Sequence, residues 1–181
     1  LLALDRSTDA TTWAAVQGAA AAVISALGAE DQVAITSVFE EVQLIQEFTT
    51  DKDAALAALA GVAPGGQFSA INPAFVDAVN RFNDGSPARR AIILVADAPD
   101  NISTVAAADV VTQVTGRGTP IYVVGYGARV QNEPSFEQIA TATGGRFFAI
   151  GAANDLQTTL TSLLPQLRQG YRVDLVSTLT A

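Results

Sequence analysis

The sequence predicts an α/β fold: a doubly wound, mostly parallel six-stranded sheet with one antiparallel edge strand and helices on both faces. One observation is that short runs such as 1–4 and 91–96 are apolar without alternation, which is typical of parallel strands buried on both faces. A second is that these runs alternate with longer helical patterns. A third is that aspartates end both runs, which places Asp5 and Asp97 at the carboxyl edge, where open α/β folds bind ligands.

The chain begins with a strand, a helix and a hairpin. Residues 1–4 are the first predicted strand, and the Ala-rich segment 11–27 is a helix that ends at Gly28. Only two residues separate the predicted strands 32–39 and 42–49, so we expect a hairpin. Its second strand is therefore the antiparallel edge strand.

A glycine-rich loop at 64–69 separates two further predicted helices, at 52–60 and 72–82. The loop contains Gly65 and Gly66 in sequence, and such a pair allows backbone turns that other residues resist. We expect a tight turn that ends on Ser69.

The second half of the chain repeats the alternation of strand and helix. Right-handed crossovers between its strands place helices on both faces of the sheet. The predicted strands are 91–96, 121–125 and 146–150, and the predicted helices are 104–115, 135–143 and 154–167. Residues 171–178 also alternate like a strand but follow the complete fold. We therefore expect one domain at 1–168 and a trailing strand at 169–181, either an extra edge strand or the start of a neighbouring domain.

Composition narrows the classes of partner. The chain has 181 residues, 49% of them hydrophobic, which suits one globular domain. No apolar run approaches the roughly 20 residues of a membrane-spanning helix. With 18 acidic and 10 basic residues the net charge is −8, which argues against nucleic acid or an anionic membrane as the main partner.

The chain contains no histidine and no cysteine. This excludes thiol chemistry, histidine-based catalytic triads and nearly every zinc site. A bound metal would be a hard, oxygen-liganded cation, which means Mg²⁺, Mn²⁺ or Ca²⁺.

Candidate ligands for such a cation follow the first strand. Asp5, Ser7 and Asp9 alternate along a short loop, a spacing that lets their oxygens converge on one point. Ser69 after the Gly-Gly turn and Asp97 after a later buried strand are expected at the same edge. The alternative is that these residues only cap helices and stabilise turns, as Ser and Asp often do.

These three segments together resemble the von Willebrand factor type A (vWA) domain, including bacterial members. In that family, a metal-ion-dependent adhesion site consists of an Asp-x-Ser-x-Ser loop, a Thr after a Gly-Gly turn and an Asp after a later strand. The resemblance implies that Ser7 coordinates Mg²⁺ directly and that Asp5 and Asp97 act directly or through water. Ser69 stands where the family has Thr, and either hydroxyl can coordinate a cation.

Asp9 stands where the family has a second Ser, which is the main departure. A carboxylate at this position adds negative charge, which could tighten Mg²⁺ binding or favour the larger, carboxylate-rich shell of Ca²⁺. It could instead cap the following helix and leave the metal one ligand short.

The resemblance implies a metal-dependent protein-binding module, in adhesion or complex assembly, that binds an acidic side chain of another protein through the cation. The alternative is a metal-independent scaffold that binds by shape and acidic surface. We expect no enzymatic activity, because His and Cys are absent and Lys52 is the single lysine available as base or nucleophile. We expect an extracellular or cell-surface location, with the cytoplasm as alternative.

Overall fold

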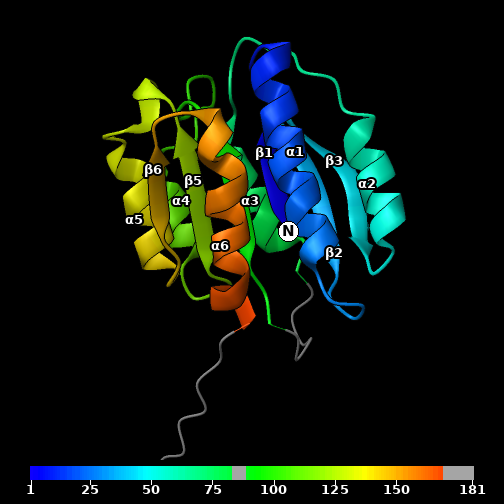
Figure 1. The fold of residues 1–181 in the computed structure, drawn as a ribbon. Helices are drawn as coiled ribbons and strands as arrows, with labels where there is room; N and C mark the ends of the chain where they lie inside the picture. The colour runs from blue at the N-terminus through cyan, green and yellow to red at the C-terminus, as the bar shows by residue number, and fades with distance from the viewer. Residues whose placement is uncertain (83–88, 169–181) are drawn as a thin grey trace, which may run out of the picture.

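The computed structural model describes residues 1–82 and 89–168 (Figure 1). The strands are β1 (Leu2–Asp5), β2 (Val33–Val38), β3 (Val42–Thr49), β4 (Ile92–Ala96), β5 (Ile121–Tyr126) and β6 (Phe147–Ile150). They form one sheet in the order β3-β2-β1-β4-β5-β6. The pair β2 and β3 is antiparallel and every other pair in this sheet is parallel. The predicted fold class is confirmed.

Helices cover both faces of the sheet (Figure 1). They are α1 (Ala10–Ala26), α2 (Lys52–Ala60), α3 (Ile71–Asn80), α4 (Ala107–Val114), α5 (Pro134–Ala142) and α6 (Leu156–Arg168), with short 3₁₀ helices η1 (Ala128–Val130) and η2 (Ala153–Asp155). Buried side chains of α1, α2 and α6 belong to one apolar core, and those of α3, α4 and α5 belong to the other. In the part of the chain described here, no helix is long and apolar enough to span a bilayer.

The two cores explain the unbroken apolar runs. Successive side chains of a strand point to opposite faces of its sheet. In β1, Ala3 packs in the core that includes α3, α4 and α5, whereas Leu2 and Leu4 pack in the core that includes α1, α2 and α6. The strand β4 divides in the same way: Leu94 belongs to the core with α3, α4 and α5, and Val95 to the core with α1, α2 and α6. A central strand buried on both faces therefore needs an apolar residue at every position.

The element boundaries agree with prediction except around the loops. The helix predicted at 104–115 begins at Ala107. Upstream of it, Asp100 Oδ1 accepts hydrogen bonds from the backbone N–H groups of Ile102 and Ser103. The helix predicted at 154–167 includes part of η2, whereas η1 is not predicted, since a single turn has too little periodicity to detect. The strand predicted at 171–178 lies outside the described residues.

The glycine-rich loop packs against the segments that follow β1 and β2. Gly65 and Gly66 both have positive φ, at 152° and 104°. The N–H of Gly65 donates to Arg6 O at 2.9 Å, and the N–H of Ala70 donates to Phe39 O at 2.7 Å. A Cβ on Gly66 would lie 3.0 Å from Phe39 Cβ and 2.9 Å from Glu40 Oε2, so the approach requires glycine. This close packing brings Ser69 to the carboxyl end of β1.

Candidate metal centre

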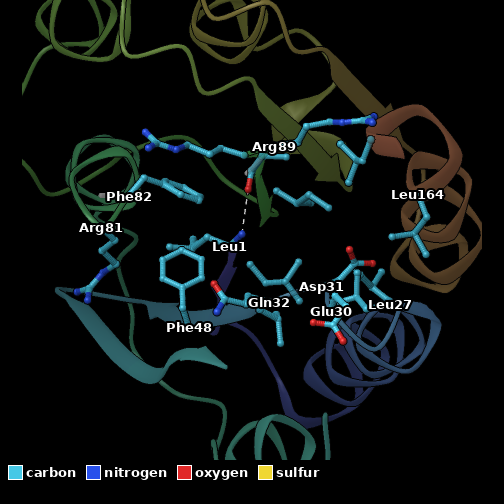
Figure 2. Close-up of a pocket in the computed structure, with 17 residues that line it drawn as sticks. Leu1, Leu27, Glu30, Asp31, Gln32, Phe48, Arg81, Phe82, Arg89 and Leu164 are labelled. Atoms are coloured by element: carbon cyan, nitrogen blue, oxygen red, sulfur yellow. Dashed lines mark hydrogen bonds between the residues drawn. The ribbon is translucent and has the colours of Figure 1, made fainter. Parts of the chain in front are cut away.

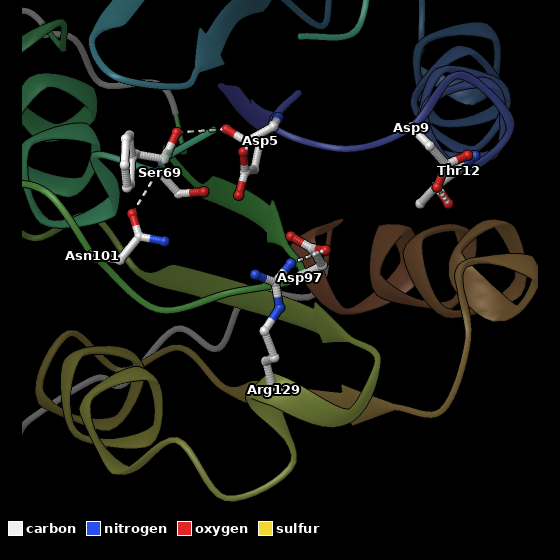
Figure 3. Close-up of polar contacts among 9 residues, drawn as sticks. Asp5, Asp9, Thr12, Ser69, Asp97, Asn101 and Arg129 are labelled. Carbon is white, nitrogen blue, oxygen red and sulfur yellow. Dashed lines mark hydrogen bonds and ion pairs between the residues drawn. The ribbon is translucent and has the colours of Figure 1, made fainter. Parts of the chain in front are cut away.

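Three of the predicted segments meet at the carboxyl edge of the sheet (Figure 3). Asp5 is the last residue of β1, and Asp97 directly follows the neighbouring parallel strand β4. Ser69 lies on the glycine-rich loop just before α3. Parallel strands end at the same edge, which is why residues that are far apart in sequence become neighbours here.

The loop after β1 is held by its own polar groups. Asp5 Oδ1 accepts a hydrogen bond from the backbone N–H of Ser7 at 2.9 Å. The hydroxyl of Ser7 donates to the carbonyl of Phe68 at 2.7 Å, which joins this loop to the glycine-rich loop. The lone pairs of Ser7 Oγ can still coordinate a cation.

Ser69 is fixed by Asn101, which lies on the segment that follows β4. The backbone N–H of Ser69 donates to Asn101 Oδ1 at 2.8 Å, and the N–H of Asn101 donates to Ser69 O at 3.3 Å. Figure 3 shows the side chain of Ser69 beside the Asp5 carboxylate, and its hydroxyl acts to lower the pKa of that carboxyl. Asn101 thus orients Ser69 towards Asp5.

Asp97 is paired with an arginine that the sequence analysis missed. Arg129 Nη2 lies 2.6 Å from Asp97 Oδ2. The side chain of Arg129 is 60% exposed, whereas that of Asp97 is 18% exposed. Arg129 belongs to η1, which follows β5 and begins after Gly127, at φ 83°. The available signal was its position, because a residue just after a parallel strand lies at the same edge as Asp5 and Asp97.

Two carboxylate oxygens of this cluster are buried without a hydrogen-bond partner, namely Asp5 Oδ2 and Asp97 Oδ1. Asp5 is only 1% exposed. Burial raises the pKa of the Asp5 carboxyl, and the charge of Asp97 raises it further, while hydrogen bonds from Ser7 and Ser69 act in the opposite direction. Burial also raises the pKa of the nearby Tyr126, and the negative charges of Asp97 and Asp5 add to that effect. The contribution of neighbouring carboxylates to both shifts shows that negative charge is concentrated at this edge, where a cation would offset it.

The residues present therefore fit a hard divalent cation. Asp5, Ser7, Ser69 and Asp97 would hold it, through two carboxylates and two hydroxyl oxygens. In the described part of the chain, no three acidic, thiol or imidazole side chains cluster in a way that could hold a metal. A cation at this edge would accordingly depend on hydroxyl and water oxygens as well as carboxylates, a mixture that suits Mg²⁺.

Asp9 is not brought together with the other four predicted residues. Its Oδ1 accepts hydrogen bonds from the N–H groups of Thr11 and Thr12, at 2.8 and 3.0 Å, and its Oδ2 accepts the Thr12 hydroxyl at 2.7 Å. These bonds make Asp9 the N-cap of α1. In Figure 3 its carboxylate is turned towards Thr12 and lies apart from Asp5 and Asp97. Asp9 therefore has the helix-capping role, which was the alternative to metal binding.

A hollow of about 950 Å³ lies at the opposite edge of the sheet (Figure 2). It surrounds the start of the chain, and its lining includes Leu1, Phe48, Phe82 and Leu164. The backbone N–H of Ile93, at the start of β4, donates to Leu1 O, which places this hollow at the amino ends of β1 and β4. It is therefore separate from the carboxylates, which lie at the carboxyl ends of the same strands.

Comparison with solved structures supports the fold. BatB from Bacteroides thetaiotaomicron matches with a TM-score of 0.75 and 18% identity, over 92% of this chain and 96% of that one. A von Willebrand factor type A protein from Catenulispora acidiphila matches with a TM-score of 0.78 and 20% identity, over 90% of this chain and 40% of that one. Proximal thread matrix protein 1 from the mussel byssus, with a zinc-occupied MIDAS motif, matches with a TM-score of 0.77 and 13% identity, over 90% of this chain and 46% of that one.

At the level of sequence, no curated protein matches this chain. The family model for the von Willebrand factor type A domain, by contrast, matches residues 1–162. That range includes all six strands and every predicted site residue. The chain therefore belongs to the von Willebrand factor type A family.

Proposed function

We propose that this vWA domain binds another protein through a divalent cation held by Asp5, Ser7, Ser69 and Asp97. vWA domains commonly mediate protein–protein interactions and often bind a divalent metal. The observation that carries the proposal is the pair of buried, unpaired carboxylate oxygens on the ends of two adjacent strands. Leaving such oxygens unpaired is costly, and a cation between them would compensate this cost.

The proposed ion is Mg²⁺, with Mn²⁺ or Ca²⁺ as possible substitutes. Mg²⁺ binds through few carboxylates and keeps several waters, whereas Ca²⁺ takes a larger shell of oxygens. Since Asp9 caps α1, two carboxylates remain for the site, which favours the smaller ion. An acidic side chain of the partner would supply a further oxygen.

Calorimetric titration of metal-stripped protein with Mg²⁺, Mn²⁺, Ca²⁺ and Zn²⁺ tests this proposal. We expect saturable Mg²⁺ binding that Asp97→Ala abolishes. Asp109→Ala is the matched control, because it removes an exposed carboxylate from the first turn of α4. Circular dichroism must show that both variants are folded. Equal binding by the Asp97→Ala variant and the wild type would overturn the proposal.

A metal-independent scaffold is the second candidate function. It is favoured by Arg129, which already supplies a positive charge at Asp97, and by Asp9, which is engaged in capping. The same titration separates the two candidates. A folded wild-type protein that binds none of the four ions would support the scaffold and exclude the cation-dependent function.

Catalysis is not part of the proposed function. The 181-residue sequence contains no His and no Cys, so a base or nucleophile from these residues beside the metal would have to be a carboxylate or a hydroxyl. We expect no turnover of generic phosphoester or peptide substrates with Mg²⁺ or Mn²⁺. Turnover that Asp97→Ala abolishes would contradict this expectation.

We further propose that the domain acts outside the cell or on its surface, where adhesion through a partner's acidic side chain would take place. The support is the adhesion-site pattern of Asp5, Ser7 and Asp97. Protease treatment of intact producing cells tests this: an exposed domain is digested, whereas a cytoplasmic control protein survives. Survival of the domain until lysis would place it inside.

A further inference from the structure

Two large apolar side chains are exposed among the residues that the structure describes, and both lie beside the candidate metal centre. Phe68 is 43% exposed and Ile102 is 44% exposed. Phe68 immediately precedes Ser69, and Ile102 immediately follows Asn101. Burying apolar surface of this kind against a partner is favourable.

The two loops that carry these side chains are joined to each other. Two hydrogen bonds connect Ser69 and Asn101, one from the N–H of Ser69 to Asn101 Oδ1 and one from the N–H of Asn101 to Ser69 O. Phe68 and Ile102 flank this pair on their respective loops. The carbonyl of Phe68 also accepts the Ser7 hydroxyl, so the backbone beneath the apolar side chains is fixed to the site itself.

Arg129 reaches the site from a different element (Figure 3). Its guanidinium contacts Asp97 through Nη2 and remains 60% exposed, so other N–H groups of the guanidinium are available to a ligand. The charges of Asp5 and Asp97 would balance a divalent cation, which leaves the charge of Arg129 in excess. A divalent cation, these two carboxylates and Arg129 then sum to one positive charge, in a chain whose net charge is −8.

The other charged groups near these loops are already engaged within the protein. The guanidinium of Arg6 lies 3.8 Å from the centre of the Phe39 ring and donates to Ala63 O. Glu40 accepts the backbone N–H of Gln67, and Asp100 accepts that of Asn72. Arg129 is therefore the cation best placed to meet an incoming anion.

We infer that the partner presents a carboxylate side chain with apolar neighbours, and that Arg129, Phe68 and Ile102 recognise it. The carboxylate lies between the cation and the Arg129 guanidinium, and an adjacent apolar side chain packs on Phe68 and Ile102. Arginine suits this role because its planar group binds carboxylates with directed hydrogen bonds. This inference rests on the proposed function, and it adds which partner sequence the site selects.

The test uses Mg²⁺-loaded, ¹⁵N-labelled protein and three blocked peptides: Gly-Leu-Asp-Leu-Gly, Gly-Leu-Asn-Leu-Gly and Gly-Ser-Asp-Ser-Gly. Amide chemical shifts report binding even at millimolar affinity. We expect the Leu-Asp-Leu peptide to change the amide chemical shifts of residues around Ser69 and Asn101. We also expect it to bind about tenfold more tightly than either of the other two peptides. Equal binding of the Asp and Asn peptides, or of the Leu-flanked and Ser-flanked ones, would overturn the inference.

Variants test separately whether Arg129 binds the carboxylate and whether Phe68 and Ile102 bind the apolar neighbours. Arg129→Gln should weaken the binding of the Leu-Asp-Leu peptide by about three- to tenfold. Its matched control is Arg117→Gln, which removes an exposed arginine from the loop before β5, at the opposite edge of the sheet. Phe68→Ser with Ile102→Ser should abolish the preference for Leu over Ser and leave Mg²⁺ affinity unchanged. Wild-type behaviour of both variants contradicts the inference.

Failure of the inference is distinguishable from failure of the proposed function. Calorimetry first establishes whether Mg²⁺ binds, and this result decides the cation site alone. If Mg²⁺ binds but no peptide shifts any amide at about 10 mM, the inferred recognition surface is wrong and the metal centre stands.

Discussion

Arg129 Nη2 lies 2.6 Å from one oxygen of Asp97, while the other oxygen of the same carboxylate is buried and unpaired. Asp97 thus has a positive charge next to its Oδ2 atom, whereas its Oδ1 atom is buried and makes no hydrogen bond. A divalent cation bound at Asp97 Oδ1 would repel the guanidinium, because like charges at this separation interact unfavourably even when partly hydrated. Metal binding and the Arg129–Asp97 pair are therefore expected to oppose each other.

Replacing Arg129 should strengthen metal binding. We expect Arg129→Gln to raise Mg²⁺ affinity about three- to tenfold at low ionic strength and less at 1 M salt, since screening weakens the interaction of exposed charges. Calorimetric titration at two salt concentrations measures this, with Arg117→Gln as the control for loss of one positive charge elsewhere. Unchanged or weaker Mg²⁺ affinity in Arg129→Gln would show that the arginine does not oppose the ion.

Neutralising Asp5 should abolish metal binding and yet stabilise the metal-free fold. Asp5→Asn preserves the shape of the side chain and removes its buried negative charge. Burial and the charge of Asp97 both raise the pKa of this carboxyl, which means that the charged form is disfavoured. We expect loss of Mg²⁺ binding together with a metal-free protein that is more stable by about 1 kcal/mol, or roughly 2–4 °C in melting temperature.

Asp97→Asn is the comparison for this experiment. It should also lose Mg²⁺ binding, but without the gain in stability, because Asp97 is paired with Arg129. Calorimetry and thermal unfolding in EDTA give both quantities. A melting temperature for Asp5→Asn below that of the wild type would contradict the view that the Asp5 charge is costly.

Gly66 should be needed for both stability and metal binding. A Cβ at this position would meet Glu40 and Phe39 at 3.0 Å or less and Ser7 Oγ at 3.4 Å, and φ is positive. We expect Gly66→Ala to destabilise the domain by about 1–3 kcal/mol and to weaken Mg²⁺ binding, since the loop carrying Ser69 must move.

Gly18→Ala is the matched control for this loop substitution. Gly18 is exposed within α1 and has nothing within 4 Å of the added Cβ. It should stabilise the domain by roughly 0.5–1 kcal/mol, because alanine favours a helix more than glycine does. Urea unfolding compares the two variants, and equal effects of the two substitutions would refute the role of the glycine turn.

The fold followed from the sequence because its signals are local and strong. Doubly buried β1 and β4 need apolar residues throughout, and that requirement is visible in the letters themselves. The edge position of Asp5 and Asp97 followed from topology alone, since parallel strands align their carboxyl ends. Their neighbour Ser69 was found through the glycine pair that precedes it.

Other features of the site depend on side-chain direction, which a sequence pattern does not specify. Asp9 has the spacing of a metal ligand and also that of an N-cap, and only its hydrogen bonds to Thr11 and Thr12 distinguish the two. Arg129 reaches Asp97 across 32 residues of sequence; its position just after β5 indicates the edge of the sheet but not the contact with Asp97. Asn101 supports Ser69 through a similarly long-range pair.

The capping role of Asp9 makes a prediction about pH. Hydrogen bonds from the Thr12 hydroxyl and from the backbone N–H groups of Thr12 and Thr11 lower the pKa of Asp9 below its ordinary value of 3.8. A carboxyl group with a lowered pKa in the folded state contributes stability above its unfolded pKa and loses it as the pH falls through the folded pKa. Asp9→Asn also caps a helix but does not titrate, so it is the matched variant.

We expect the wild type to melt above Asp9→Asn at pH 7, where Asp9 is charged and lies at the positive end of the α1 dipole. This difference should diminish as the pH falls below about 4. Asp9→Ala, which lacks a cap, should melt about 2–4 °C below the wild type at pH 7. Thermal unfolding in EDTA at pH 7 and pH 3 measures all three proteins without any contribution from metal. A constant difference between wild type and Asp9→Asn across this range would mean that the Asp9 charge does not stabilise α1.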